Sequence, residues 1–160
     1  MTKSWYFLKT RSRAEKKLQQ WMTGRRIWNY LPHYVNERIV QRRRVRTEIP
    51  IIPGYLIACM NDTERMLAHK SNMIVLAIPI EHPRKVVHQL RQIVHAARRS
   101  LELNPVAADA RTGEVVKIKS GPMAGLEGRL VRQDDKCALI VQLDALGAAF
   151  EVPISVEDLG

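Results

Sequence analysis

Lysine and arginine are the side chains of this sequence whose number and spacing point to chemistry, and that chemistry is phosphate binding. The chain of 160 residues has 26 of them against 16 Asp and Glu, for a formal net charge of +10. One group lies in or beside an expected helix: Arg11, Arg13, Lys16, Lys17, Arg25 and Arg26. A second group forms a basic tip: Arg42, Arg43, Arg44 and Arg46. This balance predicts an anionic partner, most often nucleic acid, although a solvated polar face is the alternative reading.

The remaining reactive side chains are too scattered to predict a catalytic or metal site. The five histidines have no metal-ligand spacing with cysteines or carboxylates, and His88 and His95 lie about two helical turns apart. No Ser-His-Asp pattern, carboxylate pair or phosphate-binding loop is present, because segment 121–128 lacks the GK[ST] of a P-loop. We therefore expect no enzyme, no metal and no cofactor.

Cysteine usage and hydropathy predict where the protein works. Cys59 and Cys137 each lie in an apolar run, which is typical of buried free thiols in a reducing compartment. The N-terminus reaches Lys9 and Arg11 after a short apolar run, so it is no signal peptide, and no segment approaches the ~20 apolar residues of a membrane span. We expect a cytoplasmic protein that does not enter membranes.

The elements that position the basic residues follow from hydrophobic periodicity. Apolar runs predict strands over 5–8, 55–60 and 73–80, and a long hairpin over 27–40 and 45–49 around the basic tip. Helical spacing predicts helices over 13–24 and 84–99, and Asn61 with Glu64 predicts a capping box for a helix ending near Lys70. Residues 1–100 should form an α+β domain, a mostly antiparallel sheet flanked by helices.

Charge and composition change after residue 100. Residues 1–100 hold 20 Lys and Arg against 6 Asp and Glu, whereas residues 101–160 hold 6 against 10. Segment 101–112, with Pro105, is interpreted as a linker. Beyond it, short β-rich runs at 115–118, 128–132, 138–143 and 150–154 predict a small five-stranded β-barrel over 113–160, because so small a sheet must close on itself to bury its apolar residues.

Two stretches carry a family resemblance. The run GEVVKIKSGPMAGLEGRLVR resembles a KOW motif of an SH3-like barrel, with Gly121, Pro122, Gly125 and Gly128 between two strands. Gly121 and Gly125 are expected at positive φ, and Gly128 where another backbone passes closely. In the other half, Trp5-Tyr6 before the basic helix, Pro32 after Leu31, and the run Ile52-Pro53-Gly54-Tyr55-Leu56 resemble the NusG N-terminal domain. The chain as a whole resembles the NusG family of transcription elongation factors.

The resemblance implies partners for each surface. One sheet face with its adjoining turn would dock on the clamp helices of RNA polymerase, through Trp5, Phe7, Lys9, Ile51, Ile52, Pro53, Gly54 and Tyr55. The basic residues would approach non-template or upstream DNA, by Arg11, Arg13, Lys16, Lys17, Arg25, Arg26, Arg42, Arg43 and Arg44. The KOW barrel would recruit a ribosomal protein or a termination factor. The factor would act as a monomer, suppress pausing and modulate termination.

The sequence also departs from the family pattern, and alternative interpretations remain open. Val75 stands where family members usually have Gly, and the tip is unusually basic, so we expect a specialised paralogue acting in antitermination. Ile52 and Tyr55 can also be read as ordinary core residues, and a ribosome- or RNA-binding KOW protein without polymerase affinity is the rival function. Because β-branched residues occupy every strand expected after residue 113, we predict a constitutive barrel that moves freely on its linker rather than a helical hairpin.

Overall fold

The computed structural model describes residues 2–100, 104–106, 113–121, 124–133 and 136–155. By compactness the chain divides into two units, Met1–Pro83 (unit 1) and Arg84–Gly160 (unit 2). The sequence predicts a boundary near residue 100. The division falls earlier, so helix α3 (Pro83–Ser100) groups with the C-terminal strands.

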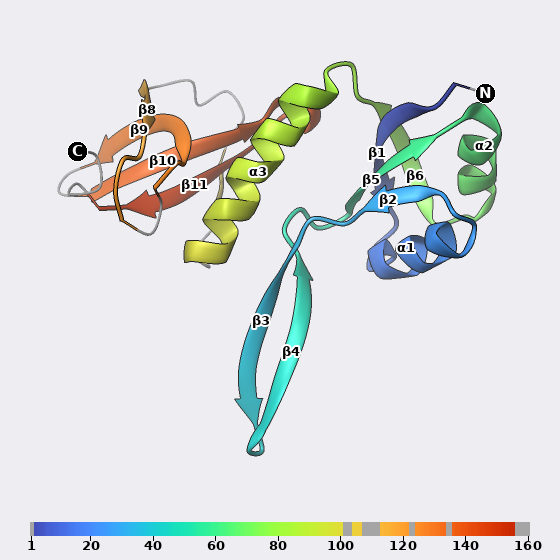
Figure 1. The fold of residues 1–160 in the computed structure, drawn as a ribbon, viewed down its shortest axis with the longest axis horizontal. Coiled ribbons are helices and arrows are strands. Elements are labelled where there is room, and N and C mark those ends of the chain that lie inside the picture. The colour runs from blue at the N-terminus through green and yellow to red at the C-terminus, as the bar shows by residue number, and fades with distance from the viewer. Residues whose placement is uncertain (1, 101–103, 107–112, 122–123, 134–135, 156–160) are drawn as a thin grey trace. The chain divides into compact units, whose positions relative to one another are not determined.

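Unit 1 contains a four-stranded antiparallel sheet in the order β2-β5-β1-β6 and a separate two-stranded hairpin, β3-β4 (Figure 1). Its elements along the chain are β1 (Ser4–Thr10), α1 (Glu15–Gly24), β2 (Trp28–Tyr30), β3 (His33–Val40), β4 (Arg43–Pro50), β5 (Tyr55–Met60), α2 (Asp62–Lys70) and β6 (Ile74–Pro79). The sequence predicts all of them except the break between β2 and β3, at Leu31 and Pro32. The antiparallel α+β architecture expected for this part of the chain is confirmed.

One face of the four-stranded sheet packs against α1 and α2. Alternation along β1 places Tyr6 and Leu8 on this face, where they cluster with Leu18 and Met22 of α1 and Ala68 of α2. Leu18 and Met22 are fully buried. Burying such a side chain contributes ~1.5–3 kcal/mol. This i, i+4 pair therefore fixes α1, and the basic residues that it carries, on the sheet.

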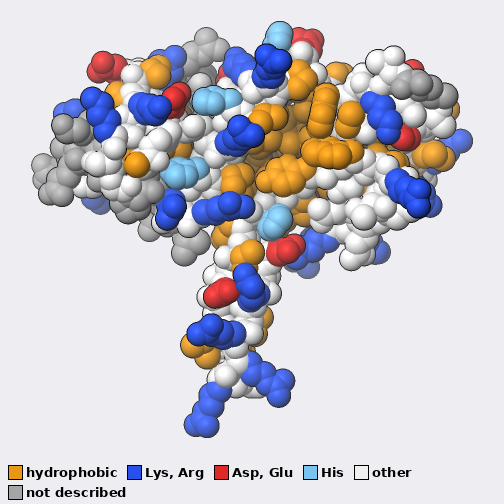
Figure 2. All heavy atoms as spheres, viewed as in Figure 1, with side chains coloured by type: hydrophobic (Ala, Val, Ile, Leu, Met, Phe, Trp, Pro, Cys, Tyr) orange, Lys and Arg blue, Asp and Glu red, His pale blue; other side chains and the backbone are white. Residues whose placement is uncertain are grey.

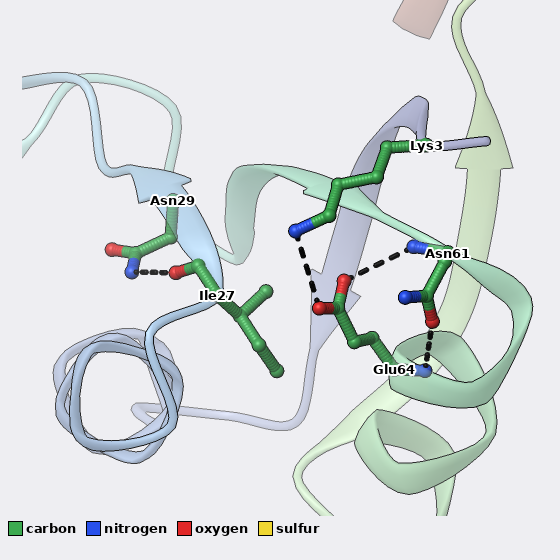
Figure 3. A network of polar contacts seen from close by, with 5 residues as sticks. All are labelled: Lys3, Ile27, Asn29, Asn61 and Glu64. Carbon is green, nitrogen blue, oxygen red and sulfur yellow. Dashed lines mark hydrogen bonds and ion pairs between the residues drawn. The ribbon is translucent and has the colours of Figure 1, made fainter. Parts of the chain in front are cut away.

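Helix α2 begins at the capping box that the sequence predicts. The Asn61 side chain accepts a hydrogen bond from the Glu64 backbone N–H (2.8 Å), and the Glu64 carboxylate accepts one from the Asn61 N–H (3.0 Å). Lys3 Nζ lies 3.2 Å from Oε1 of the same carboxylate, so the start of β1 is tied to the start of α2 (Figure 3). Two backbone donors that a helix leaves unpaired are thus satisfied locally.

The β3-β4 hairpin is the long hairpin that the sequence predicts, and it projects away from the four-stranded sheet (Figure 1). Its register runs from the His33–Pro50 pair to the Val40–Arg43 pair. The connecting residues Gln41 and Arg42 have φ values of +50° and +64°. Positive φ at both positions is the geometry of a type I′ turn, which normally selects Asn and Gly. The usual sequence signal for the turn is therefore missing although the turn forms.

Unit 2 combines α3 with a five-stranded antiparallel sheet in the order β7-β11-β10-β9-β8. Its strands are β7 (Asn104–Val106), β8 (Glu114–Lys117), β9 (Glu127–Gln133), β10 (Lys136–Leu143) and β11 (Ala148–Ile154), with the single turn η1 (Asp144–Leu146) before β11. Four of these strands are the predicted β-rich runs. In the described residues β7 and β8 do not pair with each other, so the sheet has the expected five strands without the expected closure into a barrel.

The fifth strand lies inside segment 101–112, which the sequence predicts to be a linker. β7 occupies 104–106 and pairs with β11, whereas the rest of that segment lies outside the described residues. β7 is an edge strand, and edge strands are where proline is found within sheets.

The glycines of the KOW-like segment have the geometry that the sequence predicts. Gly121 and Gly125 have φ values of +82° and +91°. The Gly125 N–H donates to the Ile118 carbonyl (2.8 Å), which closes the loop after β8. A Cβ atom at Gly128 would lie 2.5 Å from the carbonyl oxygen of Ile140, so only glycine lets β9 approach β10 this closely.

Helix α3 is held on the unit 2 sheet by two glutamines. Gln89 Nε2 donates to Asp144 Oδ2 (3.0 Å), and Gln89 Oε1 accepts from the Asp144 N–H (3.1 Å). Gln92 Oε1 accepts from the Glu127 N–H (2.7 Å), and Lys85 Nζ lies 2.9 Å from Asp144 Oδ2. The apolar stripe of the helix is also buried, at Val86, Leu90, Ile93, Ala96 and Ala97. The sheet is thus attached to α3 in this structure, whereas the sequence predicts a barrel that moves freely on its linker.

Candidate functional site

The face of the four-stranded sheet opposite α1 and α2 is rich in aromatic side chains. Strand alternation predicts that Trp5, Phe7, Lys9 and Tyr55 share one face, and the register agrees, because Lys9 pairs with Tyr55 and Phe7 with Ile57. β2 and β6 extend the same face on either side. We call this set the aromatic face: Trp5, Phe7, Lys9, Trp28, Tyr30, Tyr55, Ile57, Cys59 and Leu76.

Two tryptophans meet at one end of the aromatic face. Trp5 and Trp28 are both cross-strand partners of Cys59, and their rings contact edge to face with centroids 4.8 Å apart. Trp28 remains 50% exposed and Trp5 is half-buried. An edge-to-face pair adds ~0.5–1.5 kcal/mol beyond its buried area. The pair therefore presents rigid aromatic surface to solvent.

The Ile-Pro-Gly-Tyr segment at 52–55 forms a type II turn beside this face. The Tyr55 N–H donates to the residue 52 carbonyl (3.2 Å), and Gly54 has φ +85°, as the third position of such a turn requires. Two further bonds hold the turn: the Gly54 N–H donates to Glu15 Oε1 (2.8 Å), and its carbonyl accepts from the Thr10 N–H (2.8 Å). The turn fixes Tyr55 at the start of β5.

The eight residues predicted to bind polymerase lie together but differ in exposure. Lys9 and Pro53 are exposed, and Trp5, Gly54 and Tyr55 are half-buried. The other three are buried, with 1% of Phe7, 6% of Ile51 and 5% of Ile52 exposed. Ile52 is therefore a core residue in this structure, as the alternative interpretation predicts, whereas Tyr55 is not.

Sequence reasoning missed three exposed members of the aromatic face. Trp28 is 50% exposed, Tyr30 36% and Leu76 50%. The alternation of Trp28 and Tyr30 within the predicted extended segment was the available signal for the first two. Leu76 offered none, because its side of the sheet depends on its cross-strand partner, which is Lys9 of β1.

All nine predicted nucleic-acid contacts are exposed, in two groups, one around α1 and one at the hairpin turn: Arg11, Arg13, Lys16, Lys17, Arg25, Arg26, Arg42, Arg43 and Arg44. None of the nine takes part in an ion pair within the described part of the chain. Arg11 instead donates to the Asn72 side chain (3.1 Å), and the Arg25 guanidinium stacks 4.1 Å from the centroid of the Trp21 ring. Their charges are free to meet phosphates.

Arg26 occupies a position where glycine is normally preferred. The Arg26 N–H donates to the Thr23 carbonyl (3.1 Å) and the Ile27 N–H to the Met22 carbonyl (3.0 Å), which is the Schellman pattern at the end of α1. Arg26 supplies the left-handed residue of this pattern, with φ +58°. A side chain in that conformation costs about 1 kcal/mol or more. Glycine at this position would make the fold more stable.

The described residues give no sign of a metal site or a membrane span. No group of three or more His, Cys, Asp or Glu side chains among them is arranged to hold a metal ion. No helix in the described part of the chain is long and apolar enough to cross a membrane. Cys137 is a buried free thiol, as predicted, and Cys59 is free and half-buried. Pro122, the fourth predicted KOW residue, lies outside the described residues.

Comparison with known proteins decides the family. The family model of the transcription termination factor NusG matches residues 3–107, about two thirds of the chain. The chain belongs to the NusG family. A solved structure described as "Domain interaction in Thermotoga maritima NusG" is similar to this NusG-family chain, with a TM-score of 0.52 and 18% identity, over 99% of this chain and 96% of that one. At that identity the likeness shows the fold. No curated protein matches.

Family membership indicates a role in transcription and assigns α3 to the family domain. The NusG match runs past Pro83, through α3, to residue 107. By its contacts, however, α3 belongs to unit 2. This NusG-family chain therefore has one helix that belongs to the family domain by sequence and to the C-terminal unit by packing.

Proposed function

We propose that this NusG-family chain is a transcription elongation factor that binds RNA polymerase over the DNA channel, suppresses pausing and modulates termination. It performs no catalysis of its own. It acts by binding the closed, active clamp more tightly than other states, which shifts the polymerase toward that state. The observation that carries this proposal is the aromatic face, where Trp28 is half exposed on a rigid sheet.

The aromatic face is the proposed contact with the polymerase clamp helices. A contiguous exposed apolar patch is typical of a protein interface. Aromatic residues contribute much of the binding energy of such interfaces. Because two hydrogen bonds hold Gly54 in place, Tyr55 loses little conformational entropy on binding. Trp5, Trp28, Tyr30, Tyr55 and Leu76 form the accessible contact, and the buried Phe7 and Ile52 support it.

The two groups of free basic residues are the proposed contacts with DNA. Those around α1 suit the non-template strand, since a basic surface can follow a single-stranded backbone without reading its bases. Arg26 supports this assignment, because it stands where glycine would be more stable. The hairpin turn is assigned to upstream DNA.

The part of unit 2 from residue 113 onward is the proposed KOW module, which recruits a ribosomal protein or a termination factor. The positive φ of Gly121 and Gly125 and the close approach at Gly128 support this assignment. The unusually basic tip supports a specialised paralogue acting in antitermination, and the proposed factor binds polymerase as a monomer.

Co-elution of the full chain with core RNA polymerase tests the polymerase contact. We expect Tyr55→Ala combined with Trp28→Ala to lose about 2 kcal/mol or more of binding free energy, since central aromatic anchors commonly cost this much. The matched control is Met66→Ala, which removes an apolar side chain that is 58% exposed on α2, away from the aromatic face. Ile52→Asp is unsuitable, because it would place a carboxylate at a buried position.

Two outcomes would contradict the proposal. One is equal co-elution of the double variant and the control. The other is a parent chain that fails to bind polymerase but sediments with ribosomes, which is the behaviour of the rival RNA-binding function.

A further inference from the structure

The two faces of the β3-β4 hairpin differ in charge. Alternate pairs of a β ladder share a face, so the register divides the hairpin residues into two sets. One set contains no acidic residue, and we call it the acid-free face: Tyr34, Asn36, Arg38, Val40, Arg43, Val45, Thr47 and Ile49. The other set, the mixed face, contains two glutamates among its eight members: His33, Val35, Glu37, Ile39, Arg44, Arg46, Glu48 and Pro50.

On the mixed face the charges are largely compensated. Arg46 Nε lies 3.0 Å from Glu37 Oε1, and His33 Nε2 lies 4.0 Å from Glu48 Oε1. On the acid-free face Arg38 and Arg43 are both exposed, and neither takes part in an ion pair within the described residues. Figure 2 shows Lys and Arg side chains gathered at the free end of the hairpin. The acid-free face therefore has a net charge of +2 at its outer half, from Arg38 and Arg43, whereas the two arginines of the mixed face are offset by its two glutamates.

The hairpin also lacks a partner strand. It forms its own two-stranded sheet, and no third strand of the described residues pairs with it. A two-stranded ribbon is marginally stable in water by itself. Its outer half nevertheless exposes Val40, which is 45% exposed between Arg38 and Arg43 on the acid-free face. A partner that accepts both cations and methyl groups would match this surface.

We propose that the acid-free face of the hairpin inserts into the major groove of duplex DNA. The inference deepens the proposed DNA contact and rests on it. The major groove of B-DNA is about 12 Å wide and about 8.5 Å deep, and it admits a two-stranded β-ribbon, whereas the minor groove is only about 6 Å wide. With ~3.3 Å per residue, the ladder is roughly 26 Å long, enough to place its outer half in the groove.

The chemistry of the acid-free face suits base edges as well as phosphates. Arg38 can donate two hydrogen bonds to guanine, Asn36 can pair with adenine, and Val40 can contact the thymine methyl group. Arg42 in the turn, and Arg43 next to it, lie at the end of the ribbon, where they reach phosphates on either side of the groove. The glutamates of the mixed face then point away from the DNA.

The sharpest test compares arginines on opposite faces. Arg43→Gln and Arg46→Gln each remove one exposed arginine of β4, but only Arg43 lies on the acid-free face, and Arg46 is paired with Glu37. Binding of the full chain to a fluorescent duplex of about 30 base pairs is measured over a salt series. We expect Arg38→Gln/Arg43→Gln to weaken binding about 10-fold and to lower the slope of log K against log salt by ~0.9 for each phosphate that is no longer neutralised. Arg46→Gln should change either quantity far less than Arg43→Gln.

A chemical probe and a polymerase assay complete the experiment. The parent chain and Arg46→Gln should protect guanine N7, an atom of the major groove, from dimethyl sulfate, whereas Arg38→Gln/Arg43→Gln should not. All variants should co-elute normally with polymerase, so failure here is distinguishable from failure of the proposed function. Four results would each overturn the inference: equal losses of duplex binding in Arg43→Gln and Arg46→Gln, absent N7 protection, an equal loss of affinity for a single strand in Arg38→Gln/Arg43→Gln, or loss of polymerase binding through Arg43→Gln.

Discussion

At the scale of single residues, Arg26 is the position where stability and proposed function oppose each other. It holds the left-handed position that ends α1, where glycine has no steric cost. The sequence shows the arginine and predicts the helix end at Gly24, where α1 does end. Only the backbone geometry shows that Arg26 occupies a position unfavourable for its own side chain.

Arg26→Gly should therefore stabilise unit 1 and weaken its binding to single-stranded DNA. We expect the free energy of unfolding to rise by up to about 1 kcal/mol. The salt slope on a single-stranded oligonucleotide should fall by ~0.7 if Arg26 neutralises one phosphate. Denaturant titration and fluorescence anisotropy measure the two effects, with Lys70→Gly as a control for removal of charge elsewhere in unit 1. A more stable variant with an unchanged slope would show that Arg26 is only solvated.

At the scale of elements, Gly128 of β9 shows how a glycine sets the spacing between strands. Gly128 has no room for a Cβ atom, because the Ile140 carbonyl would lie 2.5 Å away. The spacing SGPMAGLEG predicted this kind of close approach, although the sequence did not identify β10 as the neighbouring strand.

In the β3-β4 hairpin the strands were predictable from the sequence and the turn was not. The type I′ turn lies at Gln41 and Arg42, and neither residue favours positive φ.

Gly128→Ala should destabilise the unit 2 sheet by about 1–3 kcal/mol, the usual cost of forcing extra volume into a packed site. Hydrogen exchange of the β9 and β10 amides should accelerate accordingly. Gly24→Ala is the matched control, because a Cβ atom there meets nothing within 4 Å. Unchanged protection in β9 and β10 after Gly128→Ala would mean that the two strands are less closely packed in solution than in this structure.

At the scale of the whole molecule, the position of helix α3 changes how charge is divided between the two units. With α3 included, unit 2 holds 11 Lys and Arg against 10 Asp and Glu, and unit 1 holds 15 against 6. The excess positive charge therefore belongs to the unit that carries both proposed DNA contacts. The C-terminal segment is acidic only when it is separated from α3, whose Lys85 pairs with Asp144.

Removing both glutamine contacts should loosen the attachment of α3 to the unit 2 sheet. In Gln89→Ala/Gln92→Ala the backbone N–H groups of Asp144 and Glu127 lose their acceptors, so we expect their exchange with solvent deuterium to accelerate at least several-fold. Arg91→Ala, an exposed change on the same helix, is the control. NMR of the full chain should also show strand signals throughout the described part of 113–155. Equal exchange rates in parent and double variant would show that α3 does not dock in solution.

The sequence by itself determined the order of elements, the capping box of α2, the KOW-like glycine geometry and the family, because these depend on local periodicity and on residues close together along the chain. It also placed Trp5, Phe7, Lys9 and Tyr55 on one face, since strand alternation has a period of two. Only the tertiary structure decided that Phe7 and Ile52 are buried, that Trp28 and Leu76 join the aromatic face, and that α3 binds the unit 2 sheet. These depend on register and on contacts between residues far apart in the chain, which no local pattern encodes.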